Sequence, residues 1–183
     1  MKLEKLEKDY YYHIYNKGIN GTNIFSNNEN KSYFLKQLDK HLKDDLSIYA
    51  YCLMDNHFHL IIKVNSDPDI VTQGFSNFFN SYAKAYNKQI SRTGSLFEKH
   101  FKRIRLQDEL YLKNLVLYVH LNPKHHLDID YKSFLFSSYK SFLSDKETKL
   151  ARKDVLDLFE GKENFIFCHT IKNDLLTEKH TFE

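Results

Sequence analysis

The sequence predicts an α+β fold, an antiparallel sheet with helices packed on one face. Short segments rich in aromatic and β-branched residues indicate strands, and longer segments with apolar residues at every third or fourth position indicate helices. Two of the strands are separated by only two residues, a spacing that requires an antiparallel hairpin. The segments follow the order strand, helix, strand, strand, helix, strand, helix, which is typical of α+β domains.

The first half of the chain supplies the hairpin and the helix that precedes it. Residues 10–20 are predicted to form an aromatic strand that ends in Gly-containing turn residues. Residues 28–44 are predicted to form an amphipathic helix, because their Phe and Leu residues recur at helical spacing. Strands follow at 47–54 and 57–64, and Asp55-Asn56 between them tolerates the left-handed backbone of a tight turn.

The second half of the chain supplies two more helices and a basic segment. Residues 69–90 are predicted to be helical, with aromatic residues on one side and Asn, Gln and Lys on the other. A turn is predicted at 92–94, followed by a basic strand or extended arm over 96–106. Residues 108–122 are predicted to form the next helix, which Pro123 should end because proline disfavours helical geometry in the residue before it.

Length and composition restrict the classes of protein to consider. The 183 residues fit one domain, which we place at 1–145, followed by a short, mainly helical tail over 146–183. Hydrophobic residues make up 42% of the chain, which is enough for a packed core and excludes wholesale disorder. The net charge of +3 excludes a strongly basic coat protein, so any binding of DNA must come from a local patch.

Cysteine usage and hydropathy indicate a cytoplasmic protein without a membrane partner. Cys52 and Cys168 lie far apart, which suggests neither a disulfide framework nor a zinc knuckle. Residues 1–8 are charged and contain no apolar leader segment, and no stretch of the sequence approaches the length of a membrane span.

His57-Phe58-His59 is the first candidate for chemistry. Side chains alternate between the faces of a strand, so both imidazoles should lie on one face, about 7 Å apart along the backbone, with Phe58 on the other. Two imidazoles at this spacing can bind one divalent ion. The same pattern also fits two exposed polar residues on a half-buried sheet, so the pair alone does not decide between these readings.

Tyr118 and Asn122 are the second candidate. They lie at positions i and i+4 of a predicted helix and therefore share a face, whereas His120 projects to roughly the opposite side. A helix laid on the sheet would offer the histidine pair an amide oxygen for a metal and a phenol as the attacking group. A core tyrosine with an asparagine cap before Pro123 fits the same pattern, and both readings stay open here.

Several segments, in order along residues 10–145, carry a family resemblance. They are Asp55–Ile62, Tyr82–Asn87, Gly94–Phe97, Tyr118–Pro123 and Phe136–Tyr139. The first resembles the histidine–hydrophobic–histidine (HUH) motif of insertion-sequence-type single-tyrosine transposases. The fourth resembles the tyrosine helix of their REP-associated branch, and the others resemble its intervening Tyr-Ala, Tyr-Asn and Gly-x-x-Phe signature and its closing motif. A His-x-His motif alone is weakly specific, whereas the ordered set is strongly specific.

This resemblance implies a ferredoxin-like fold and a DNA-cleaving and rejoining transposase. His57 and His59 would bind Mg²⁺ or Mn²⁺, with Asn122 as the third protein ligand. Tyr118 would attack a DNA phosphate, leaving a 5′-phosphotyrosine and a free 3′-hydroxyl that can later reverse the step. The substrate would be single-stranded or hairpin DNA, and the protein would act as a monomer or a homodimer.

A group of basic residues near these motifs is the predicted DNA-binding patch. Its members are Lys84, Lys88, Arg92, Lys99, Lys102, Arg103 and Arg105. Phosphate contacts would supply affinity, and nearby aromatic rings would stack on unpaired bases. Family members often carry an arginine soon after Gly-x-x-Phe, whereas here the first arginine after this motif is Arg103. The alternative is an ordinary solvated face.

Two other functions compete with the transposase. One is a domesticated descendant that binds structured DNA or RNA without cleaving it. The other is a zinc protein that combines His57 and His59 with His100, His125 or His126. Zinc usually takes four tetrahedral ligands and no cysteine lies near these histidines, so we rank this alternative last.

Overall fold

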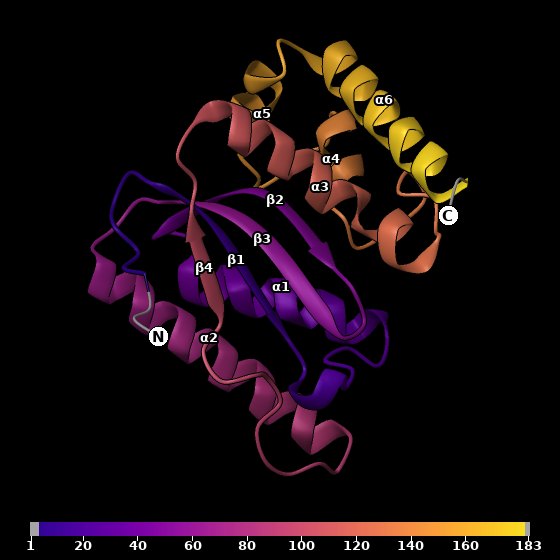
Figure 1. Cartoon of the computed structure of the whole chain (residues 1–183). Coiled ribbons are helices and arrows are strands. Elements are labelled where there is room, and N and C mark those ends of the chain that lie inside the picture. The colour runs from indigo at the N-terminus through magenta and orange to yellow at the C-terminus, as the bar shows by residue number, and fades with distance from the viewer. Residues whose placement is uncertain (1–3, 182–183) are drawn as a thin grey trace.

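The centre of the molecule is a four-stranded antiparallel sheet, seen here in a computed structural model that describes residues 4–181 of the backbone (Figure 1). Its strands lie in the order β2-β3-β1-β4. They are β1 (Tyr11–Lys17), β2 (Leu46–Leu53), β3 (His57–Val64) and β4 (Lys102–Arg105). The helices are η1 (Ile19–Gly21), α1 (Asn28–Leu42), α2 (Pro68–Gln89), α3 (Glu109–Leu127), α4 (Tyr139–Leu143), α5 (Arg152–Leu158) and α6 (Lys162–Thr181). The order β1-α1-β2-β3-α2-β4 with this pairing is ferredoxin-like, so the predicted fold class is confirmed.

One face of the sheet packs on α1 and α2, as predicted. The strand residues on this face, such as Ile14, Phe58 and Leu60, are fully buried in one apolar cluster with both helices. Helices α1 and α2 approach each other closely at Gly74, where a Cβ atom would lie 2.6 Å from Cδ2 of Leu42. The glycine therefore fixes how tightly the two helices pack.

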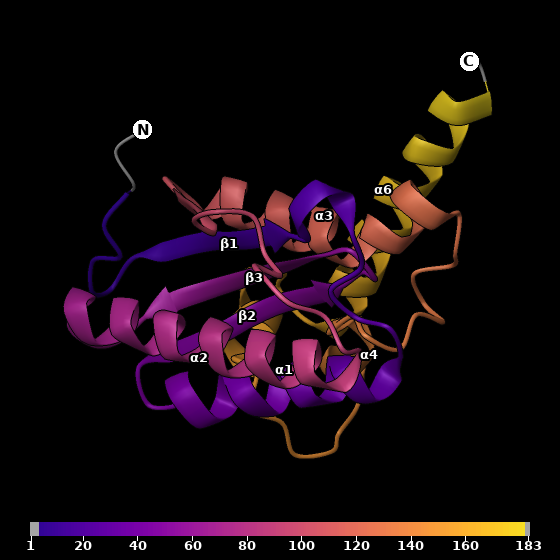
Figure 2. The same cartoon turned by 90° about the horizontal axis from the view of Figure 1, so that it is seen from below.

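The opposite face also carries helices, which the prediction of helices on one face did not include. Figure 2 shows α3 and α6 across the sheet from α1 and α2. Ala50, Cys52 and Ile61 point to this side and are fully buried with apolar residues of α3. The reason is that Ala50, Cys52 and Ile61 make part of this second face apolar as well, so this part of the sheet needs a second cover.

Helix α3 is longer than predicted, because it continues through Pro123 to Leu127. Proline at this position removes one backbone hydrogen bond, to the carbonyl group of Val119. The last turn still closes, because Asp128 adopts a left-handed conformation (φ 53°) and its N–H bonds to the Pro123 carbonyl. The predicted strand or arm over 96–106 forms a strand only at Lys102–Arg105. The residues before it form a loop.

The tail packs against α3 as part of the second helical layer. Val155, Phe159 and Phe165 are fully buried in the apolar cluster that contains the inner side of α3. The predicted boundary at residue 145 therefore separates segments that share one core. Within residues 4–181, no helix is both long and apolar enough to cross a membrane.

Candidate active site

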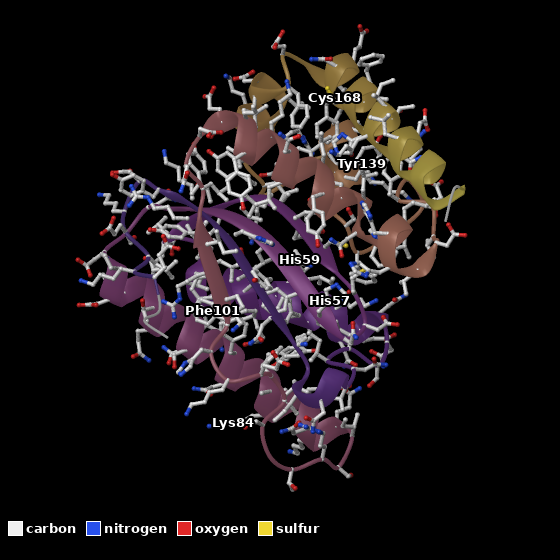
Figure 3. The ribbon with its side chains drawn as sticks, viewed as in Figure 1. His57, His59, Lys84, Phe101, Tyr139 and Cys168 are labelled. Atoms are coloured by element: carbon white, nitrogen blue, oxygen red, sulfur yellow. The ribbon has the colours of Figure 1, made fainter. Side chains whose placement is uncertain are left out.

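Helix α3 brings the four predicted chemical groups together on one face of the sheet. His57 and His59 lie next to each other on β3, with ring centroids 5.3 Å apart (Figure 3). The Tyr118 ring packs edge-on against His59 at 5.7 Å between centroids. The Asn122 Oδ1 atom lies 3.4 Å from Nε2 of His57. Tyr118 and Asn122 share a helix face, as predicted, and this face lies against the strand face that carries the two histidines.

The structure places Tyr118 and Asn122 differently from the core tyrosine and the helix cap of the alternative reading. Tyr118 is 38% exposed, unlike Tyr12 and Tyr82, which are fully buried in the core. Asn122 is buried in the interior of α3 and is not a terminal cap. The phenol and the amide therefore face the histidine pair from a continuous helix.

The hydrogen bonds of His57 leave two lone pairs facing each other. Its Nδ1 atom lies 2.7 Å from Oδ1 of Asn56, and an amide oxygen only accepts, so Nδ1 carries the proton. Burial lowers the pKa of His57, and a neutral imidazole has only one N–H. Nε2 of His57 and Oδ1 of Asn122 are then both acceptors at 3.4 Å. This arrangement suits a cation that both atoms can coordinate.

His59 is oriented by a residue that the sequence analysis did not select. Its Nδ1 atom lies 2.8 Å from Nε2 of His13, on the neighbouring strand β1. Burial lowers the pKa of His59 to about 2 and that of His13 to about 4, so both rings are neutral at pH 7. When His59 donates its Nδ1–H to His13, its Nε2 lone pair is left for a metal. Alternation along the first strand gives only the face on which His13 lies, and the pairing of β1 with β3 is what brings it to His59.

A cavity of about 390 Å³ opens in front of these groups. Tyr118, His57 and His59 line it together with Lys102 of the edge strand β4 and His126 of α3. The His126 ring lies 5.4 Å from the His57 ring. Tyr118, Asn122 and His126 are spaced four residues apart, so all three share a helix face. Because the helix was predicted to end at Pro123, His126 was not placed on this face. The sequence analysis named it only in the zinc alternative.

The donor set fits a divalent ion of the Mg²⁺ or Mn²⁺ type. Two neutral imidazoles and an amide oxygen are suitable ligands for Mn²⁺, and the amide oxygen also suits Mg²⁺. The fit depends on Asn122, because among the side chains that the structure describes, those of residues 4–175, no group of three His, Cys, Asp or Glu is placed to hold a metal. The zinc alternative loses support for the same reason, and His100 lines a different cavity.

The seven predicted DNA-binding residues are distributed over different surfaces. Lys102 lines the Tyr118 cavity, whereas Lys84 lines a second cavity beside α2. The Arg92 guanidinium donates hydrogen bonds to Asn87 and Ser95 and so holds a loop. Arg103 stacks on Phe101, with 4.3 Å from its Cζ atom to the ring centroid.

Of the remaining basic residues, one is held by contacts within the protein and two are exposed. Arg105 pairs with Glu7 at 2.9 Å and lies over the Tyr10 ring. Lys88 and Lys99 are exposed. The role of each basic residue at DNA stays a prediction, and Lys102 is the member that lies beside Tyr118.

Comparison with known proteins supports the fold. The sequence matches no family model and is similar to no curated protein. Among solved structures, the chain is similar to a REP-associated tyrosine transposase bound to a REP hairpin, with a TM-score of 0.61 and 14% identity over 79% of this chain and 85% of that one. A second structure, tRNA(His) guanylyltransferase from Saccharomyces cerevisiae, has a TM-score of 0.44 with 11% identity over 85% of this chain and 80% of that chain, too low to carry an argument.

Proposed function

We propose that this protein is a metal-dependent endonuclease and strand transferase of single-stranded DNA, which acts through a 5′-phosphotyrosine on Tyr118. The observation that carries the proposal is the position of Tyr118. Its exposed ring stands beside His57, His59 and Asn122, in a cavity that is open to a ligand. The shared fold with a REP-associated tyrosine transposase supports the same reading.

The proposed reaction exchanges one phosphodiester bond for another. The Tyr118 oxygen forms a bond to phosphorus and loses its proton, while the bond from phosphorus to the 3′-oxygen breaks and that oxygen gains a proton. When bound, Mg²⁺ or Mn²⁺ supplies positive charge to the phosphate oxygens. A phenolate is a weaker base than a sugar alkoxide, so the tyrosine oxygen leaves more readily than a sugar oxygen when the step is reversed.

The residues around Tyr118 have separate roles in this proposal. His57, His59 and Asn122 would hold the metal, and Lys102, which lines the same cavity, would bind a phosphate oxygen. His13 would keep His59 in the tautomer that a metal needs. All of these side chains come from one chain, so the proposed site does not need a second copy.

The proposed substrate is single-stranded DNA next to a hairpin. The transposase with the similar fold was solved with a REP hairpin bound. The cavity in front of Tyr118 holds about 390 Å³, so we expect it to take one phosphate with its sugar from an unpaired strand. A single strand beside a paired stem satisfies both observations.

The test is a denaturing gel of labelled single-stranded DNA from the flanks of the protein's own gene, incubated with Mn²⁺ or Mg²⁺. We expect the wild type to form a denaturant-resistant protein–DNA adduct that disappears with EDTA and in Tyr118→Phe. Tyr111→Phe is the matched control, because Tyr111 is a similarly exposed tyrosine of the same helix outside the cavity.

The other outcomes have separate meanings. Specific binding of the hairpin without an adduct would contradict the proposal and favour a domesticated binder that does not cleave. An adduct that persists in Tyr118→Phe would mean that another group is the nucleophile.

A further inference from the structure

A second and larger cavity lies beside the Tyr118 cavity and has no role in the reaction described so far. It has a volume of about 700 Å³ and lies between α2 and the loop that precedes β4. Figure 3 shows two residues that line it, Lys84 and Phe101, on the α2 side of the molecule, away from α3. The motifs Tyr82–Asn87 and Gly94–Phe97 flank this cavity from its two sides.

The two cavities are neighbours, because Asn16 and Glu98 line both of them. The Asn16 side chain is fixed there, since its Nδ2 donates to the Glu98 carbonyl at 3.2 Å and its Oδ1 accepts from the Lys17 N–H at 2.9 Å. Lys17 Nζ also pairs with Glu98 Oε1 at 3.3 Å. Asn16 and Glu98 therefore form a fixed wall that a bound chain would cross from one cavity to the other.

The far wall of the second cavity is also held in place. Asn87 donates to the carbonyl of Gly94 at 2.8 Å and accepts from Arg92 at 3.2 Å. Arg92 donates in turn to the carbonyl of Ser95 at 2.7 Å. Gly94 has φ +85°, a conformation that favours glycine. These bonds tie the loop to the end of α2 and so fix the shape of the cavity wall.

The lining combines stacking surfaces with free polar groups. Phe79, Phe97 and Phe101 are half-buried and form the apolar part of the wall. Asn80 and Lys84 are exposed on α2 and, within the part of the chain that the structure describes, have no hydrogen-bond or ion-pair partner. Aromatic rings stack on unpaired bases, an amide can bond a base edge, and an ammonium group binds phosphate.

We infer that this second cavity binds an unpaired nucleotide of the same DNA strand that Tyr118 attacks. The scissile phosphate lies in the first cavity, the strand crosses Asn16 and Glu98, and the adjoining base enters beside Phe97 and Phe101. Lys84 binds the phosphate of that nucleotide. The inference rests on the proposed function, because it is the attacked strand that connects the two cavities.

The experiment measures binding of single-stranded DNA separately from cleavage. Fluorescence anisotropy of a labelled oligothymidylate of about 16 nucleotides, in EDTA and in a Tyr118→Phe background, reports affinity alone. We expect Lys84→Glu to weaken binding about tenfold and to reduce the slope of log affinity against log salt by about 1. Lys36→Glu on α1 is the matched control, because Lys36 is exposed and lines neither cavity.

A second variant tests the space and not the charge. Ala83→Trp places an indole in the cavity, and we expect it to weaken binding about tenfold as well. Photocrosslinking with 5-iododeoxyuridine in the same oligonucleotide should label a peptide that contains Phe97 or Phe101. This labelling is measured on the unaltered lining, so it does not depend on how Ala83→Trp folds.

The outcomes distinguish this inference from the proposed function. Unchanged affinity in Lys84→Glu, with crosslinks outside residues 94–101, overturns the inference even when the wild type forms a Tyr118 adduct. Weakened binding and crosslinks at Phe97 or Phe101, without any adduct in the wild type, support a nucleotide site and refute the cleavage. Absence of binding by the wild type overturns both.

Discussion

Two groups of histidines lie on opposite sides of α3, and they differ in how their lone pairs are used. On the tail side, the Nδ1–H of His169 bonds to the Phe165 carbonyl at 2.7 Å, so its Nε2 accepts from His120 at 2.9 Å. His120 Nε2 then accepts from the Ser138 hydroxyl at 2.8 Å. Each ring nitrogen in this group has a partner. On the cavity side, Nε2 of His57 and Oδ1 of Asn122 face each other as acceptors.

The hydrogen bonds at the ring nitrogens therefore distinguish a structural histidine from one that is available to bind a metal. The tail-side rings are fully buried and complete their own hydrogen bonds, so they bind two helices and a strand together. The cavity-side rings are held by Asn56 and His13 on one nitrogen only, which leaves the other free for a ligand. We expect mutations on the tail side to change stability and those on the cavity side to change metal binding.

The largest effect should come from the tail. Phe165→Ala should reduce the free energy of unfolding by about 3–5 kcal/mol, because the ring is fully buried beside His120 and His169. Urea unfolding followed by circular dichroism measures this loss. Phe167→Ala is the control on the same helix, where the ring is 61% exposed and the loss should be small. Equal losses for both would show that the tail does not contribute to the core.

The next effect is a loss of stability in acid. Burial lowers the pKa of His169 to about 4 and that of His120 well below its ordinary value, so the folded state resists protonation while the unfolded state takes up protons below about pH 6.5. Stability should therefore fall as the pH decreases from about 6.5 to 4, by about 3 kcal/mol for His169 alone. Melting temperatures across this range test it. His169→Gln should flatten the dependence, and an unchanged slope would contradict the assignment.

On the cavity side, His57→Ala should weaken Mn²⁺ binding by more than about 100-fold, since it removes a proposed ligand. Isothermal titration with Mn²⁺ measures the affinity. The melting temperature should change little, because His57 is only partly buried and lies at the cavity. A large loss of stability with unaltered Mn²⁺ affinity would place His57 in the structural class instead.

The smallest effect should come from His13, which does not line the cavity but lies against two residues that do, His59 and Tyr15. His13→Phe removes the acceptor for the Nδ1–H of His59, and we expect a loss of about 10–100-fold in Mn²⁺ affinity. His13→Gln keeps an acceptor oxygen and should recover part of that affinity. Equal affinities for both variants would mean that His13 does not select the tautomer of His59.

Local sequence patterns predicted the parts of this site that depend on short-range geometry. The strand over His57–Val64 has the predicted bounds, and the i, i+4 spacing brought Tyr118 and Asn122 to one face. The pattern failed where tertiary packing overrides local preference. Pro123 was expected to end the helix, yet the buried helix continues past it and carries His126 into the site.

Longer-range features were not accessible from the sequence in the same way. The partnership of His13 with His59 depends on which strands pair, and no spacing within either strand reveals it. The predicted DNA-binding patch treated Lys102, Arg103 and Arg105 as one group. Alternation along β4 sends Lys102 to the Tyr118 cavity, while Arg105 pairs with Glu7.

The position of β1 in the middle of the sheet affects how the protein folds during synthesis. This strand pairs with β3 on one side and with β4 on the other. Tyr12 therefore pairs with Arg105, a residue far away from it in the sequence. Such non-local pairing raises the contact order and slows folding. Because α3 follows β4, Tyr118 can join the imidazoles of β3 only after α2, β4 and the first half of α3 have been synthesised. A nascent chain therefore carries the two halves of the proposed active site apart from each other until the sheet has formed.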